Sequence, residues 1–140
     1  MILFPKAPTM QPITNDQWIL HDDFACMFRG NFITIKKGFE TDGISIPRIA
    51  WRAIGHPFSM PLLPCALIHD ALYAGELVSR KDADWLFLCL MQRAKIGWVK
   101  RNLVWSAVKL GGGLVWSRHT VDGVLKARKH CSLQKAKKAL

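Results

Sequence analysis

The chain has 140 residues, half of them hydrophobic and about a fifth charged, which is the composition of one globular domain and not of a disordered segment. No stretch reaches the roughly 18 uninterrupted apolar residues of a membrane-spanning helix, and the proline-containing start is unlike a signal peptide. The four cysteines are widely separated without metal-ligand spacing, so we expect reduced thiols and no disulfide scaffold.

The excess positive charge is confined to the last third of the chain. The net charge is +10, yet residues 1–94 contain nine Lys or Arg and nine Asp or Glu. Residues 95–140 contain eleven Lys or Arg and a single acidic residue, Asp122. Such asymmetry favours a surface that meets an anionic membrane, nucleic acid or an acidic protein. The hypothesis of nucleic-acid binding rests on charge alone, because no recognition motif accompanies the basic residues. The alternative is that these residues form a solvated helix face and a solubilising tail.

The first third of the chain predicts extended structure. Residues 1–15 hold three of the seven prolines and are expected to form an extended arm. Two β-rich runs follow between Trp18 and Phe39, separated by Arg29-Gly30-Asn31, which predicts a β-hairpin. Residues 40–48 carry an Asp-Gly turn and an extended approach to a proline, and are expected to form a loop.

Helical periodicity dominates after residue 60. An apolar helix is predicted over 61–74, ending near Gly75. A second is predicted over 79–95, with Ser79 as its N-cap and Asp82 in its first turn. The short connection between them predicts an antiparallel helix pair.

A third, amphipathic helix is predicted over 97–116, although Gly111-Gly112-Gly113 should weaken, kink or interrupt it. Residues 120–140 are expected to form a basic helical tail. We therefore predict an α+β fold, in which a β-hairpin or small antiparallel sheet precedes a helical C-terminal half. The expected organisation is an arm over 1–15, one domain over 16–119 and the tail over 120–140.

The segment PCALIHDALY, residues 64–73, places two titratable groups in an apolar helix, where they need partners. In the predicted helix pair, facing residues have numbers that sum to about 153, so His69 should meet Asp84. Tyr73 lies one turn beyond His69 on the same face. Asp70 is about 100° round the helix and should face the loop that covers the other side.

A paired histidine and carboxylate suit the activation of water. The imidazole of His69 can act as a general base near neutral pH, and Asp84 would fix its tautomer and stabilise the imidazolium. Asp70 is a hard oxygen ligand that suits Ca²⁺, with carbonyls from the loop 41–45 as further ligands. Asp42 in that loop is either an ordinary turn residue or a second metal ligand.

The pattern H-D-x-x-Y followed by a helix with D-x-x-F resembles the catalytic core of phospholipases A2, above all the short form in parvovirus capsids. The resemblance covers about 20 residues. It implies that His69 is the base, that Asp70 binds Ca²⁺, and that Tyr73 and Asp84 support the histidine. The glycine-rich calcium loop and the flanking cysteines of that family are absent here.

A broader resemblance is carried by the patterns GFxTDGxSIPR at 38–48, ALIHDxLY at 66–73 and SRKxADxxF at 79–87. These are similar to a family of small phage and prophage proteins of unknown function, over roughly 30–116. The resemblance implies a phage-type protein in the virion or the host cytoplasm, with other phage structural proteins as partners. It implies no chemistry.

Two functions from different classes are consistent with these patterns. The first is a tail- or baseplate-associated, phospholipase-A2-like hydrolase of lipid esters, with residues 95–140 on an anionic membrane. The second is a structural or assembly protein of the virion in which His69 and Asp84 only join two helices. A metal-dependent HD phosphohydrolase is disfavoured, because His56 stands in a Gly-His-Pro context that resists helix formation. The tryptophans at 98, 105 and 116 share one helix face, which favours core packing over a lipid interface.

Overall fold

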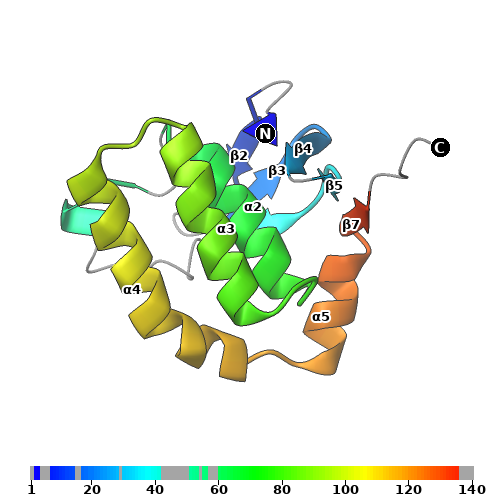
Figure 1. Ribbon diagram of the computed structural model, residues 1–140. Coiled ribbons are helices and arrows are strands. Elements are labelled where there is room, and N and C mark those ends of the chain that lie inside the picture. Colours follow the sequence, from blue (N-terminus) through cyan, green and yellow to red (C-terminus); the bar gives the residue numbers. More distant parts are fainter. Residues whose placement is uncertain are drawn as a thin grey trace.

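Two small antiparallel sheets precede a set of packed helices, which confirms the predicted α+β class (Figure 1). The computed structural model describes residues 2–3, 7–14, 17–28, 30–41, 51–53, 55–56 and 60–135. Residues 42–50, which include Asp42 and most of the expected carbonyl ligands, lie outside these described residues.

The predicted hairpin is present as β4 (Phe24–Phe28) and β5 (Asn31–Ile35). Phe28 pairs with Asn31, which leaves a two-residue loop, and Gly30 in that loop has φ +73°, a value that favours glycine. Alternate side chains of both strands, among them Cys26 and Ile33, enter the core. The hairpin thereby supplies the floor on which the helices pack.

Both chain ends join this hairpin in one four-stranded sheet of order β1-β4-β5-β7. β1 (Ile2–Leu3) pairs with β4, and β7 (Cys131–Lys135) pairs with β5. The expectation of a helical tail over 120–140 is therefore wrong for 131–135. In this segment apolar and polar residues alternate, and the open edge of β5 provides the backbone partners that a strand requires.

A second sheet, of order β2-β3-β6, carries one residue of the site. β2 (Met10–Pro12) pairs with β3 (Trp18–Leu20), which pairs with β6 (Glu40–Thr41). The expected arm over 1–15 is thus extended but paired, since it contributes a strand to each sheet. β6 ends at Thr41, whose side chain contacts the first of the long helices.

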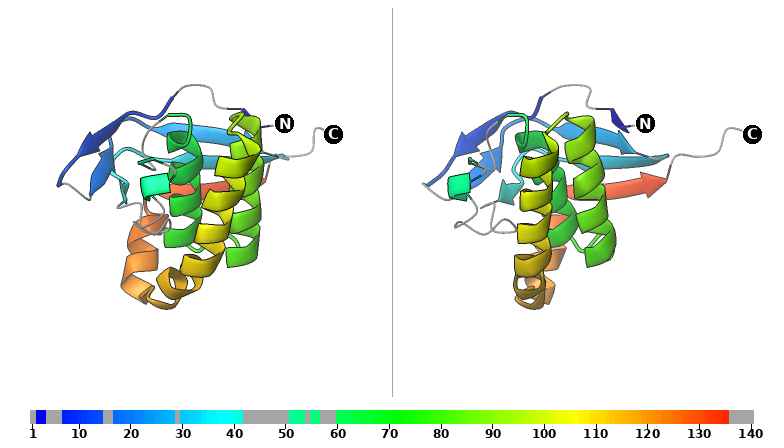
Figure 2. Two further views of the ribbon diagram at one scale, coloured as in Figure 1. Left: turned by 90° about the vertical axis from the view of Figure 1, so that its left-hand side faces the viewer. Right: turned by 60° about the vertical axis from the view of Figure 1, so that its left-hand side comes forward.

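The helices are α2 (Leu63–Ala74), α3 (Arg80–Arg93), α4 (Trp98–Ser117) and α5 (Val121–Arg128). The first three lie side by side on one side of the sheets, and α5 packs against α2 (Figures 1 and 2). The hydroxyl of Ser79 accepts a hydrogen bond from the backbone N–H of Asp82, as the predicted cap requires. α2 and α3 form the predicted antiparallel pair.

α2 is the central element of the core. Every residue from Leu63 to Tyr73 is buried, because the helix contacts β5, α3 and α5. A helix that is apolar around its whole circumference needs such complete cover. The two titratable residues His69 and Asp70 are therefore placed in the most enclosed part of the fold.

The glycine run does not interrupt α4, which spans Trp98–Ser117 and confirms the helix predicted over 97–116. Gly112 lies against α2, where an added Cβ would stand 2.5 Å from the phenol oxygen of Tyr73. An alanine there would therefore clash, and the cost of glycine in a helix is offset by this close approach. Within the described residues, no helix is long and apolar enough to cross a bilayer.

Candidate functional site

His69 and Asp84 meet between α2 and α3, as the sum of their positions predicts. The His69 Nε2 and Asp84 Oδ1 atoms are 2.9 Å apart. The two residues are 1% and 6% exposed, so the hydrogen bond is shielded from water. An ion pair or charge-assisted hydrogen bond in such a setting is stronger than one at the surface.

Tyr73 completes the predicted trio. Its hydroxyl donates to the same Oδ1 atom of Asp84, at 2.7 Å. Burial and the hydrogen bond to Asp84 raise the pKa of the phenol well above its ordinary value. Tyr73 therefore stays protonated, and the Asp84 carboxylate accepts two hydrogen bonds at one oxygen.

Two aromatic rings pack against the imidazole of His69. The ring stacks on Phe87, with centroids 4.6 Å apart and planes at 28°, and its centroid lies 4.3 Å from that of Tyr73. With Nε2–H donating to the Asp84 carboxylate, the lone pair of the neutral ring is on Nδ1. Nδ1 is buried and has no hydrogen-bond partner within the part of the chain that the structure describes. It is thus the free basic atom of the site.

Asp70 faces away from Asp84, as predicted, and toward β6. Its Oδ2 atom accepts a hydrogen bond of 2.5 Å from the Thr41 hydroxyl, and its Oδ1 atom lies 4.0 Å from Nδ1 of His69. Asp70 is 8% exposed. The structure therefore brings Asp70 to the free side of the imidazole and fixes it through the residue that precedes the loop 42–50.

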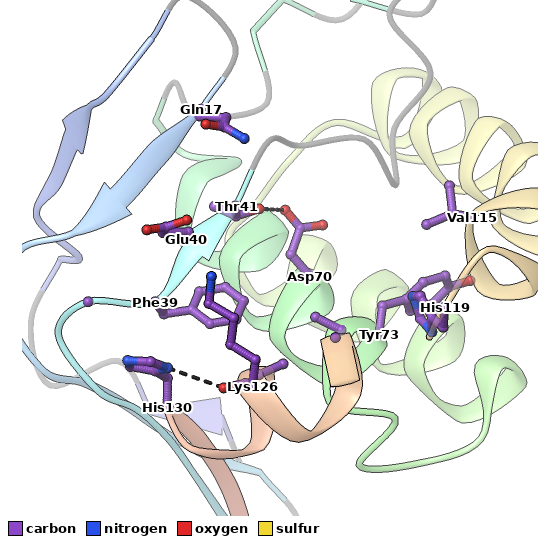
Figure 3. Close-up of a pocket in the computed structure, with 14 residues that line it drawn as sticks. Gln17, Phe39, Glu40, Thr41, Asp70, Tyr73, Val115, His119, Lys126 and His130 are labelled. Carbon is purple, nitrogen blue, oxygen red and sulfur yellow. Dashed lines mark hydrogen bonds between the residues drawn. The ribbon is translucent and has the colours of Figure 1, made fainter. Parts of the chain in front are cut away.

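A cavity of about 340 Å³ opens beside this group (Figure 3). Asp70 and Tyr73 line it from α2. Thr41 and Phe39 line it from the side of β6, and α5 contributes Lys126, whose side chain points into the space. His69 does not itself line the cavity, but its Nδ1 atom lies 4.0 Å from Oδ1 of Asp70, which does.

The sequence did not predict the cavity residues that are contributed by elements other than α2. Thr41 belongs to one of the motifs, but its contact with Asp70 spans 29 positions. Lys126 and His130 belong to the segment expected as a tail, and nothing in their local pattern indicates that α5 closes a cavity. The only signal was the concentration of positive charge after residue 95.

Only part of the predicted calcium site lies within the described residues, because Asp70 and Thr41 are described and residues 42–45 are not. Among the described residues, no group of three or more His, Cys, Asp or Glu side chains could hold a metal ion. Asp70 offers one carboxylate and Thr41 a hydroxyl, whereas Ca²⁺ takes six to eight oxygens. The described residues therefore do not by themselves fit the ion, and Asp42, the second predicted ligand, lies outside them.

Cysteine chemistry does not compete with this site. Cys26, Cys65 and Cys131 are buried free thiols, and Cys89 is a partly buried one. Burial raises the pKa of Cys26 and Cys131 to about 11 and that of Cys65 to about 12. Thiols in this state are weak nucleophiles near neutral pH.

One comparison with known proteins gives a match. Residues 18–108 match the model of a family described as "Protein of unknown function (DUF1353)". This range is more than half of the chain and contains Thr41, His69, Asp70, Tyr73 and Asp84, whereas α5 and β7 lie beyond it. No curated protein and no solved structure matches the chain.

Proposed function

The chain belongs to the DUF1353 family, whose function is unknown, and we propose that it is a hydrolase in which His69 activates water against a lipid ester. The observation that carries the proposal is that the two ring nitrogens of His69 have different surroundings. Its Nε2 atom is held by Asp84, and its Nδ1 atom is buried without a described hydrogen-bond partner, 4.0 Å from the carboxylate of Asp70, which lines the cavity. A histidine that serves only to join two helices has no need of a base on its other side.

The reaction uses these contacts. Nδ1 of His69 takes a proton from a water molecule as the water oxygen attacks the ester carbonyl. Asp84 stabilises the imidazolium through Nε2–H, and Tyr73 holds the Asp84 oxygen in place. The tetrahedral adduct then expels the alkoxide, which receives the proton from His69. The products are a carboxylic acid and an alcohol, and the histidine returns to its neutral form.

Calcium remains a prediction from the phospholipase A2 resemblance. When bound at Asp70, the ion would polarise the ester carbonyl and stabilise the oxyanion. The missing ligands would have to come from 42–50, including Asp42. The proton transfers of His69 do not depend on the ion.

The substrate class is supported by the composition of the cavity and of the chain. Phe39 and Val115 supply apolar wall, and Lys126 supplies a cation for a negative group near the ester. The net charge of +10 favours an anionic surface. The resemblance of the sequence motifs to those of phage and prophage proteins supports a virion protein of the tail or baseplate that acts at the membrane, with other phage structural proteins as its partners.

A structural role for the pair is the alternative, and one observation favours it. His69 is 1% exposed, stacks on Phe87 and contacts the ring of Tyr73, as a histidine that only joins two helices would. In that case the protein is a non-enzymatic component of a virion or its assembly.

The experiment is ester hydrolysis on vesicles of anionic phospholipid, measured with Ca²⁺ and with a chelator. We expect fatty acid release by the wild type and a loss of about 10²- to 10⁴-fold in His69→Gln. His21→Gln, at an exposed histidine, is the matched control and should retain full activity. A folded wild type that releases no fatty acid under either condition would establish the structural alternative.

A further inference from the structure

α4 exposes a line of large apolar side chains on the side that faces away from the core. Val99, Leu103, Leu110 and Leu114 are 65%, 51%, 88% and 58% exposed. At 100° per residue, these four positions fall within about 60° of one another on the helix. We call them the outer stripe. Soluble domains seldom leave such a continuous apolar line on a surface without a partner.

The opposite face of α4 accounts for the contacts of this helix with the rest of the fold. Val104, Val108 and Gly112 are buried there. The tryptophans behave as the sequence favoured, since Trp105 and Trp116 pack against the core and only Trp98 is largely exposed. The outer stripe is therefore a feature separate from the tryptophans, and the packing of the domain does not require it.

Basic side chains flank the outer stripe. By helical rotation, Lys109 lies on one side of it, and Lys100 and Arg118 lie on the other. Lys109 stands over the ring of Trp105, 4.3 Å from its centroid, and so lies further from the stripe than Lys100 and Arg118. Asp122 is the only acidic residue in 95–140. An occupant of this face should accordingly be apolar in its centre and negative around it.

We infer that the outer stripe of α4 binds the surface of an anionic lipid bilayer, with the helix lying in the plane of the interface. α4 lies at the outer edge of the helical layer, where a flat surface can reach it (Figure 2). Amphipathic helices with apolar and basic faces bind membranes in this way. A second copy of the chain is a poor occupant, because it would oppose like charges with no carboxylates to match them.

The inference deepens the proposed function, on which its link to catalysis rests. The inner side of α4 contacts the site directly, since Trp116 packs edge-on against Tyr73 at 5.2 Å and Val115 lines the cavity. The outer stripe and the site thus lie on opposite sides of one helix, which is about 10 Å across. Binding through the stripe would bring the cavity within reach of lipid.

The test is vesicle co-sedimentation of the catalytically silent His69→Gln chain. We expect it to bind vesicles with about 30% anionic lipid, to bind neutral vesicles weakly, and to dissociate as salt is raised. Adding Leu103→Gln and Leu110→Gln should weaken binding at least about tenfold, because two leucine side chains would no longer bury apolar surface in the bilayer. A matched pair on the sheet side, Ile13→Gln and Met27→Gln, should leave binding unchanged.

The outcomes separate the two proposals. Binding that requires the stripe supports the inference even if the wild type hydrolyses no ester, in which case only the proposed function fails. Hydrolysis of a short, water-soluble ester together with absent or stripe-independent vesicle binding overturns the inference and leaves the proposed function standing. A dimer in light scattering that Leu103→Gln and Leu110→Gln dissolve would also overturn it, because the occupant would be a second copy.

Discussion

α2 and α4 depart from ordinary helix design in opposite ways. α2 is enclosed on all sides yet carries His69 and Asp70 in its buried surface. α4 has ample access to water yet places Leu110, 88% exposed, on its open side. Titratable groups inside and apolar groups outside both oppose the usual distribution of residues. The two helices meet at Tyr73 and Gly112, so the two departures belong to one part of the molecule.

This contrast distinguishes residues that stabilise the fold by burying apolar surface from residues whose position such burial does not explain. Neither Asp70 in α2 nor Leu110 in α4 is needed to bury apolar surface. Neighbouring residues in the same helices do bury apolar surface. In α2 these include Leu67 and Leu72, and in α4 they include Val108. Residues whose placement is costly or unexplained by packing are the candidates for function.

The largest expected effect concerns the support of His69. Asp84→Asn keeps the shape of the side chain but removes the carboxylate that selects the Nε2–H tautomer. Ester hydrolysis should fall by about 10²- to 10⁴-fold, close to the loss in His69→Gln. Initial rates of the single and double variants measure this. Additive losses in the double variant would show that the two residues do not act as a unit.

The contact between the two helices should be sensitive to one methyl group. Gly112→Ala places a carbon against the Tyr73 hydroxyl and should lower the free energy of unfolding by about 1–3 kcal/mol. Gly113→Ala is the matched control. Its Cβ meets only the end of the flexible Arg80 side chain, at 3.4 Å, so helix propensity should stabilise it by about 0.5–1 kcal/mol. Equal effects in urea unfolding would contradict the close approach.

The buried phenol predicts a dependence on alkaline pH. Tyr73 is the only tyrosine of the chain, so the absorbance of tyrosinate reports its ionisation alone. Its pKa is raised in the folded state, so the unfolded chain loses this proton first and stability should fall as pH rises above about 10. We expect the tyrosinate signal to appear only with unfolding. Ionisation near the ordinary pKa of about 10 in the folded protein would show that the phenol is accessible to water.

The smallest expected effect is on the open side of α4. Leu110→Ala should change the free energy of unfolding by less than about 0.5 kcal/mol, because the side chain is exposed. Val108→Ala, two positions away on the buried side, should destabilise by about 2 kcal/mol. Thermal or urea unfolding compares them. A similar loss in both would mean that the outer stripe is covered within the fold.

Local pattern was sufficient to predict most of the site. The apolar periodicity of α2 and α3 and the short turn between them predicted that His69 faces Asp84, and the one-turn spacing predicted Tyr73 beside them. The Ser79 cap was predictable from its hydroxyl and the charge of the first turn. These features depend on residues near one another in sequence, whose relative positions follow from helix geometry.

Long-range pairing could not be predicted in this way. Nothing near Cys131 indicates that the segment after α5 joins the edge of β5, since strand pairing depends on which edge remains open in the assembled fold. For the same reason, Lys126 was not recognised as part of the cavity wall. The extent of α4 was predicted, but the close contact between Gly112 and Tyr73, which explains why a glycine is placed there, was not.

The proposed chemistry depends above all on Nδ1 of His69 as the base of an ester hydrolase. The most direct measurement is the rate of fatty acid release from anionic phospholipid by the wild type and by His69→Gln, both shown to be folded by circular dichroism. We expect release by the wild type and a loss of about 10²-fold or more in the variant. Equal rates in the two proteins, or no release by either, would contradict the assignment of His69 as the base.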